Sequence, residues 1–104
     1  MAVKKLTEST FEAALKDKYM VIDFYATWCA PCSMISPIVE KISGEREDVN
    51  FYKVDVDENM DLASKFHVMS IPTLLFFKNG EAVNEVVGYL PEEQLKEVIK
   101  ETFA

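Results

Sequence analysis

Cysteine, basic residues and long apolar runs are all scarce in this chain. There are two cysteines in 104 residues, and 11 lysines and arginines against 18 acidic residues give a net charge of −7. That charge argues against nucleic acid or an anionic membrane as the main partner. No apolar run follows the basic pair near the start, so we expect no secretory signal, no membrane span and a cytoplasmic location. The length suits one domain, which we expect to cover residues 1–104.

Segments of different character alternate along the chain and predict an α/β fold. The order βαβαβαββα predicts a mixed central sheet of about five strands, flanked on both faces by about four helices. A short, nearly continuous apolar run suits a strand buried on both faces, and apolar residues at helical spacing mark the helices. The predicted helices are Ser9–Lys16, Pro31–Ser43, Asn59–Phe66 and Pro91–Phe103, and the predicted strands are Met20–Tyr25, Val49–Val56, Thr73–Lys78 and Ala82–Val87.

Local signals support several of these boundaries. Ser9 and Glu12 have the spacing of a capping box at a helix start. Asn79-Gly80 is a strong signal for a type I′ turn, so the two flanking strands should be antiparallel. Pro91 is expected at the first position of the last helix, and Pro37 should kink the helix in which it lies. His67 should end a helix in left-handed geometry.

Both cysteines fall in Trp28-Cys29-Ala30-Pro31-Cys32, between a buried strand and a helix. A structural zinc site needs about four ligands, and one distant histidine does not complete the set. A structural disulfide closing so short a loop gains little stability, and the cytoplasm would reduce it. A redox-active pair is therefore favoured. At the helix start Cys29 meets free N–H groups and the positive end of the helix dipole, worth ~1 kcal/mol and about one pKa unit.

Asp23 is the only charged residue in its apolar strand, six positions before Cys29. Burial raises the pKa of a carboxyl group and makes it a better base near neutral pH, which a buried Cys32 thiol would need. The alternative is a structural aspartate satisfied by a partner such as Lys53 on the next strand. The residues alone do not separate these two hypotheses.

Several motifs, in order and at matching spacing, resemble the thioredoxin family from end to end. Any one of them is weak support, but together they are specific. They are Val21-Ile22-Asp23-Phe24, Trp28-Cys29-Ala30-Pro31-Cys32, Pro37, Ile71-Pro72-Thr73, Phe76-Phe77-Lys78-Asn79-Gly80 and Val87-Gly88.

The resemblance implies a thioredoxin fold and a protein-disulfide reductase without a bound cofactor or metal. Cys29 would attack a substrate disulfide and Cys32 would resolve the mixed disulfide, with Asp23 as the buried base and Lys53 as its partner. The Ile71–Pro72 bond would be cis, although trans is the usual form of such bonds. The residues expected to line a substrate groove are Trp28, Met69, Ser70, Ile71, Pro72, Gly88 and Tyr89; glycine at position 88 would allow close approach of another backbone.

The resemblance also implies partners. A separate thioredoxin reductase would supply electrons to a monomer. Its clients would be oxidised proteins such as ribonucleotide reductase, peroxiredoxin and methionine sulfoxide reductase. Ala30 replaces the glycine common in the family, and Ala30-Pro31 holds no cation between the cysteines, which suits a reductant. Uncharged Thr27 and Ser33 stand where the family often has charges, so an altered partner preference is expected.

Two other functions are alternatives. A binding module could use the same groove without turnover, and in that case replacing Cys29 would leave its biological activity intact. An oxidase or isomerase is disfavoured by Ala30-Pro31 and by the expected cytoplasmic location.

One further pattern, Asp55-x-Asp57-x-Asn59-x-Asp61, imitates the start of a calcium loop, but Met60 and Phe66 replace its required glycine and glutamate. A strand end followed by a helix cap is the better interpretation.

Overall fold

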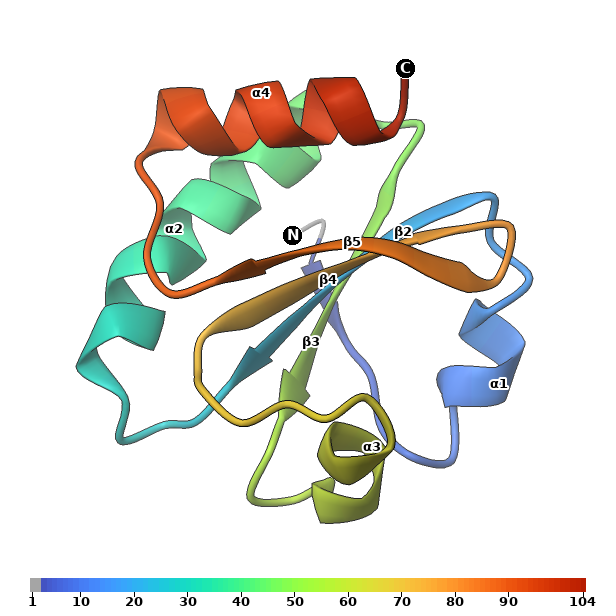
Figure 1. Ribbon diagram of the computed structural model, residues 1–104, viewed down its shortest axis with the longest axis vertical. Coiled ribbons are helices and arrows are strands. Elements are labelled where there is room, and N and C mark those ends of the chain that lie inside the picture. The colour runs from blue at the N-terminus through green and yellow to red at the C-terminus, as the bar shows by residue number, and fades with distance from the viewer. Residues whose placement is uncertain (1–2) are drawn as a thin grey trace.

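The computed structural model describes residues 3–104, so the first two residues of the expected 1–104 domain lie outside the described range. Within residues 3–104, five strands and four helices alternate in the predicted order βαβαβαββα (Figure 1). The helices are α1 (Phe11–Ala14), α2 (Ala30–Glu45), α3 (Met60–Lys65) and α4 (Glu92–Thr102). The strands are β1 (Val3–Lys5), β2 (Tyr19–Tyr25), β3 (Asn50–Asp55), β4 (Thr73–Lys78) and β5 (Glu81–Val87).

The five strands form one mixed sheet in the order β1-β3-β2-β4-β5. β3 pairs in parallel with β1 and β2, whereas β4 is antiparallel to β2 and to β5. β2 lies at the centre, and the five residues between its ends are all buried. A strand covered on both faces needs apolar residues throughout, which is why this run lacks alternation.

Two helices cover each face of the sheet, as Figure 1 shows, with α2 and α4 on one side and α1 and α3 on the other. Each pair buries its own apolar core. Side chains alternate along β2, so Val21 joins the α2/α4 core while Ile22 and Phe24 join the α1/α3 core. By the same alternation Asp23 faces α2, the helix that begins next to the two cysteines.

The predicted capping box at the first helix is wrong. α1 has only four residues, its N-cap is Thr10, and no side chain caps it. The Ser9 hydroxyl instead lies 2.9 Å from that of Thr7, whose carbonyl accepts the N–H groups of Thr10 and Phe11. Nearby, the Glu8 N–H donates to the side-chain oxygen of Asn59 at 3.1 Å, a contact across 51 positions that sequence spacing does not reveal.

Other boundaries agree more closely. Asn79 and Gly80 have φ values of 53° and 83°, so the predicted hairpin with two left-handed residues is confirmed. His67 has φ 55° just after α3, also as predicted. Pro91 is the N-cap of α4 rather than its first helical residue. β1 escaped prediction residue by residue because it has three residues and only Val3 is buried.

Candidate active site

Cys29 and Cys32 form a disulfide at the start of α2, with their Cα atoms 5.3 Å apart. Cys29 lies at a helix start, as predicted, and is the N-cap of α2; its Sγ accepts the backbone N–H of Cys32 at 3.2 Å. The side chain of an N-cap residue receives the helix N–H groups that have no partner within the helix. A negative charge on the Cys29 sulfur is therefore stabilised by the same backbone group and by the helix dipole.

Trp28, directly before this pair, is 71% exposed and forms part of the surface, as expected. Its indole N–H donates to Oδ2 of Asp57 at 2.8 Å. Sequence reasoning missed this role of Asp57 because it depends on two loops meeting, one after β2 and one after β3. As predicted, this loop follows the end of a strand and leads to a helix cap: β3 ends at Asp55, and Asn59 is the N-cap of α3, although its side chain makes no capping hydrogen bond. Asp55 Oδ1 accepts the Asp57 N–H, and the Asn59 amide donates to the Asp55 carbonyl.

The segment before β4 lies against the cysteines. Its Ile71–Pro72 peptide is cis, as the resemblance implied, and the Ile71 carbonyl oxygen lies 3.8 Å from Cys29 Sγ. The Pro72 carbonyl accepts the Gly88 N–H at 2.8 Å, which joins this segment to the end of β5. Three of the predicted groove residues, Ile71, Pro72 and Gly88, thus lie together, with Ile71 next to Cys29.

Glycine at position 88 has a reason within the chain itself, apart from the expected approach of a client backbone. Its φ is +89°, a conformation that side-chain-bearing residues rarely adopt. A Cβ atom there would meet nothing within 4 Å. Within this chain, glycine is therefore required by the backbone conformation and not by the close approach of another segment.

The remaining predicted groove residues are at the surface. Met69 is 91% exposed, Ser70 is exposed and Tyr89 is 42% exposed. Met60 is 71% exposed and shares a shallow cavity with Met69 and His67. The sequence did not indicate a place for Met60 in the groove; it showed Met60 only as a residue that breaks a calcium-loop pattern.

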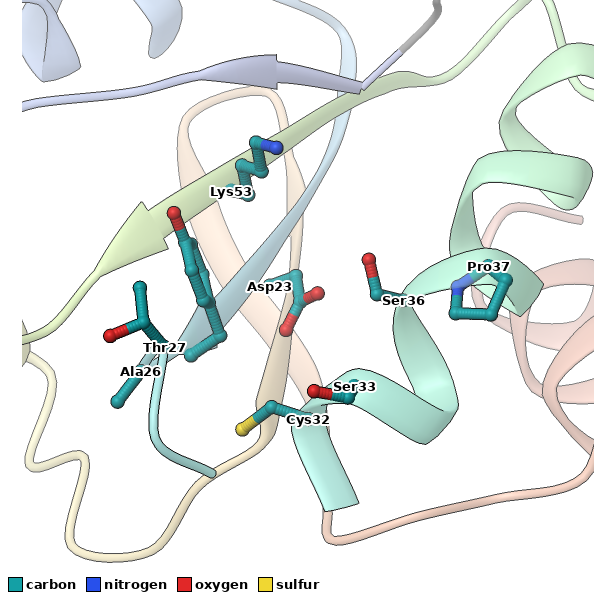
Figure 2. A pocket seen from close by; sticks show the side chains of 9 residues that line it. Asp23, Ala26, Thr27, Cys32, Ser33, Ser36, Pro37 and Lys53 are labelled. Atoms are coloured by element: carbon teal, nitrogen blue, oxygen red, sulfur yellow. The ribbon is translucent and has the colours of Figure 1, made fainter. Parts of the chain in front are cut away.

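A cavity of about 470 Å³ extends from the buried side of the cysteine pair. Figure 2 shows Asp23 from β2 and Cys32 from α2 among the side chains that line it. Asp23 is only 4% exposed, and its Oδ1 has no hydrogen-bond partner among residues 3–104. The cavity wall also contains residues that sequence reasoning had not placed beside Asp23: Tyr25, Ala26, Thr27, Ser33, Ser36 and Pro37.

Burial raises the pKa of the Asp23 carboxyl to about 7, and the positive charge of Lys53 opposes this with a smaller effect. Lys53 is opposite Asp23 in the register of β2 and β3. It is half-buried rather than buried, and among residues 3–104 it forms no ion pair with Asp23. The hypothesis that direct contact with Lys53 satisfies Asp23 is therefore wrong.

No helix among the described residues is long and apolar enough to cross a membrane.

Comparison with known proteins gives one consistent result. A family model described as Thioredoxin matches residues 2–101. The thioredoxin of Staphylococcus saprophyticus is 50% identical over 101 residues, which covers 96% of this chain and 97% of that protein. A thioredoxin of Staphylococcus aureus is 45% identical over 100 residues, covering 95% of this chain and 96% of that protein.

Solved structures agree with the sequence comparison. The crystal structure of Malassezia sympodialis thioredoxin has a TM-score of 0.88 and 42% identity, covering 98% of this chain and 91% of that one. A chain from a structural study of thiol resolution in yeast mitochondrial 1-Cys peroxiredoxin, by glutathione/thioredoxin systems, has a TM-score of 0.88 and 36% identity. That match covers 96% of this chain and 95% of the other.

Proposed function

Because the chain belongs to the thioredoxin family and is a protein-disulfide reductase, we propose that Cys29 is its attacking thiol and Cys32 its resolving thiol. The observation that carries this assignment is the different surroundings of the two sulfurs. Cys29 Sγ accepts a backbone N–H at the helix N-terminus, next to the Ile71 carbonyl. Cys32 lines the cavity that also holds the Asp23 carboxyl, whose buried Oδ1 has no hydrogen-bond partner among the described residues.

The reaction is two successive thiol–disulfide exchanges. The Cys29 thiolate attacks one sulfur of a client disulfide, a mixed disulfide forms, and the other client sulfur leaves as a thiolate. Cys32 then loses its proton and its thiolate attacks Cys29. The client departs as a dithiol after protonation, two electrons have passed to it, and a Cys29–Cys32 disulfide remains.

Asp23 is the base for the second exchange in this proposal. A carboxyl whose pKa is about 7 is about half ionised at neutral pH, so it can take the Cys32 proton and release it again. The positive charge of Lys53 keeps the pKa of Asp23 from rising further. Ala30 and Pro31, the first two residues of α2, lie between the cysteines and add no cation. No added charge therefore stabilises the thiolate form of the reduced pair, which favours the disulfide and thus a reductant.

Redox partners follow from the family. A separate thioredoxin reductase returns the pair to the dithiol form, and the clients include oxidised enzymes such as ribonucleotide reductase, peroxiredoxin and methionine sulfoxide reductase. The protein acts as a monomer in the cytoplasm. The client chain is bound around the disulfide by the groove residues, which are Trp28, Met69, Ser70, Ile71, Pro72, Gly88 and Tyr89.

The test is a pair of cysteine variants incubated with an oxidised client. Cys32→Ser should accumulate a mixed disulfide through Cys29, because attack proceeds but resolution does not. Cys29→Ser should accumulate none. Mass spectrometry of the trapped species identifies the linked cysteine, and reduction of disulfides by Cys32→Ser at the wild-type rate would rule out Cys32 as the resolving thiol. Full biological activity of Cys29→Ala would instead favour a binding module.

A further inference from the structure

Large apolar side chains are exposed around the redox disulfide. Met69, Trp28 and Met60 are 91%, 71% and 71% exposed, and we call the surface that they form the redox face. The Trp28 indole is hydrogen-bonded to Asp57, in the loop that leads to Met60, and Met60 shares a shallow cavity with Met69. Apolar side chains gathered on one exposed face mark a surface that another molecule covers. Given the function proposed above, that molecule is a client.

The charged side chains beside the redox face are carboxylates. Four of the seven residues 55–61 are acidic, and no lysine or arginine occurs from residue 54 to residue 64. The hydrogen bond from Trp28 fixes the Asp57 carboxylate against the face, and Glu58 beside it is exposed. The other two loops at the disulfide, 26–33 and 66–72, contain no lysine or arginine either.

The carboxylates of residues 55–61 are not neutralised within residues 3–104, where none of them takes part in an ion pair. Lys65, the next lysine along the chain, lies over the rings of Phe11 and Phe66, 5.2 and 5.9 Å from their centroids. Some carboxylates elsewhere do take part in ion pairs. Glu92, for example, is 2.8 Å from the ammonium group of Lys41.

The negative field of these carboxylates reaches the site itself. Tyr25 packs against the two cysteines and lines the cavity beside Cys32. Burial raises the pKa of the Tyr25 hydroxyl, and the charges of Asp55, Glu58 and Asp23 raise it further. A client chain that reaches the disulfide is therefore exposed to a negative electrostatic potential on the side where α3 lies.

We propose that the redox face selects client disulfides carried on a cationic segment, with lysine or arginine within about two residues of the cysteine that is attacked. Its apolar side chains cover the client chain near the disulfide, and the 55–61 loop attracts the cationic side chains on either side. Complementary charge raises the rate of encounter, while like charges are disfavoured. The inference rests on the proposed reductase function and adds the class of client that it prefers.

The experiment compares three fluorogenic peptide disulfides that differ only beside the cysteine, with lysine, glutamine or glutamate on both sides. For each peptide, the rate of reduction by the reduced protein is divided by its rate of reduction by dithiothreitol. This ratio corrects for differences in the intrinsic reactivity of the peptide disulfides. We expect the lysine peptide to react about tenfold faster than the glutamate peptide at ~10 mM salt, and less than about twofold faster at ~0.5 M salt.

Two charge-reversal variants localise the effect. Glu58→Lys and Glu47→Lys both change the net charge from −7 to −5, and both side chains are exposed. Glu47 lies in the α2–β3 loop, at the end of the sheet away from the disulfide, since α2 returns the chain to the start of a strand parallel to β2. We expect Glu58→Lys to reduce the preference at least about threefold and Glu47→Lys to retain it.

The outcomes separate the two proposals. Equal reduction of all three peptides would overturn the client preference and leave the reductase function standing. The same conclusion follows if the preference does not respond to salt, or if both variants change it equally. Failure to reduce even the glutamine peptide would overturn the proposed function, and the client preference with it.

Discussion

Replacing Asp23 by asparagine should stabilise the protein by an amount that is small near pH 4 and grows as the pH rises to about 7. The carboxyl is 4% exposed, and its Oδ1 has no hydrogen-bond partner. Its ionised form is therefore poorly solvated in the folded state, whereas water solvates it fully in the unfolded state. Asparagine has nearly the same shape and never ionises, so the substitution removes the cost of burying the charge while keeping the packing.

The size of the effect follows from the two pKa values. Burial raises the pKa of Asp23 from 3.8 to about 7, which corresponds to ~4 kcal/mol between the neutral and ionised forms. Below pH 3.8 the group is neutral in both states and costs nothing. Between 3.8 and 7 the unfolded state ionises first, so the folded wild type loses stability as pH rises. Above about 7 the full cost applies.

Urea unfolding of the oxidised protein at several pH values from 4 to 9 measures this directly. The free energy of unfolding of Asp23→Asn should match that of the wild type near pH 4 and exceed it by up to ~4 kcal/mol above pH 7. Glu47→Gln, at an exposed carboxylate, is the control and should show no such trend. A difference between Asp23→Asn and wild type that is the same at pH 4 and pH 8 would refute the reasoning.

Three further predictions concern the mechanism and two local structures. Asp23→Asn should slow release of the reduced client near pH 7 while leaving the Cys29 attack largely intact; stopped-flow fluorescence separates the steps, and an unchanged release step would remove Asp23 from the mechanism. Gly88→Ala should lower the free energy of unfolding by ~1 kcal/mol, because the φ of residue 88 is +89°. Gly44→Ala in α2, where an added Cβ also meets nothing within 4 Å, should raise it by up to ~1 kcal/mol. Equal urea midpoints for these two variants would contradict the backbone argument. Glu8 Oε2 caps α3 by accepting two N–H groups at the start of that helix, at 3.0 and 3.3 Å. Glu8→Ala should therefore lower the free energy of unfolding by ~1 kcal/mol, and Glu8→Gln should lower it less. Thermal unfolding measures this, and an unchanged melting temperature for Glu8→Ala would show that the cap contributes nothing.

Local patterns predicted most of the secondary structure because they act over a few residues. The run from Met20 to Tyr25 is apolar throughout because β2 is covered on both faces. Asn79 and Gly80 predict their own turn because few residues tolerate the left-handed conformation that it needs. Cys29 was placed at a helix start by the residues that follow it, and the structure makes it the N-cap of α2.

Contacts between distant segments account for what local patterns missed. A capping box at Ser9 was reasonable by spacing, but Thr7 and Thr10 organise the turn differently. The carboxylate partner of Trp28 is 29 positions away, so only the meeting of two loops could identify it. The positive φ of Gly88 likewise leaves no mark in the neighbouring residues.

The sequence by itself determined the order of elements, the position of the two cysteines at a helix start and the single charge in the central strand. These depend on residue type and spacing, which act locally. The tertiary structure alone decided that Asp23 Oδ1 has no hydrogen-bond partner and Asp23 no ion pair with Lys53 within residues 3–104, and that Ile71 lies beside Cys29. The reason is physical: solvent exclusion and contact depend on segments that the sheet order β1-β3-β2-β4-β5 brings together, and neither is encoded by neighbours in the chain.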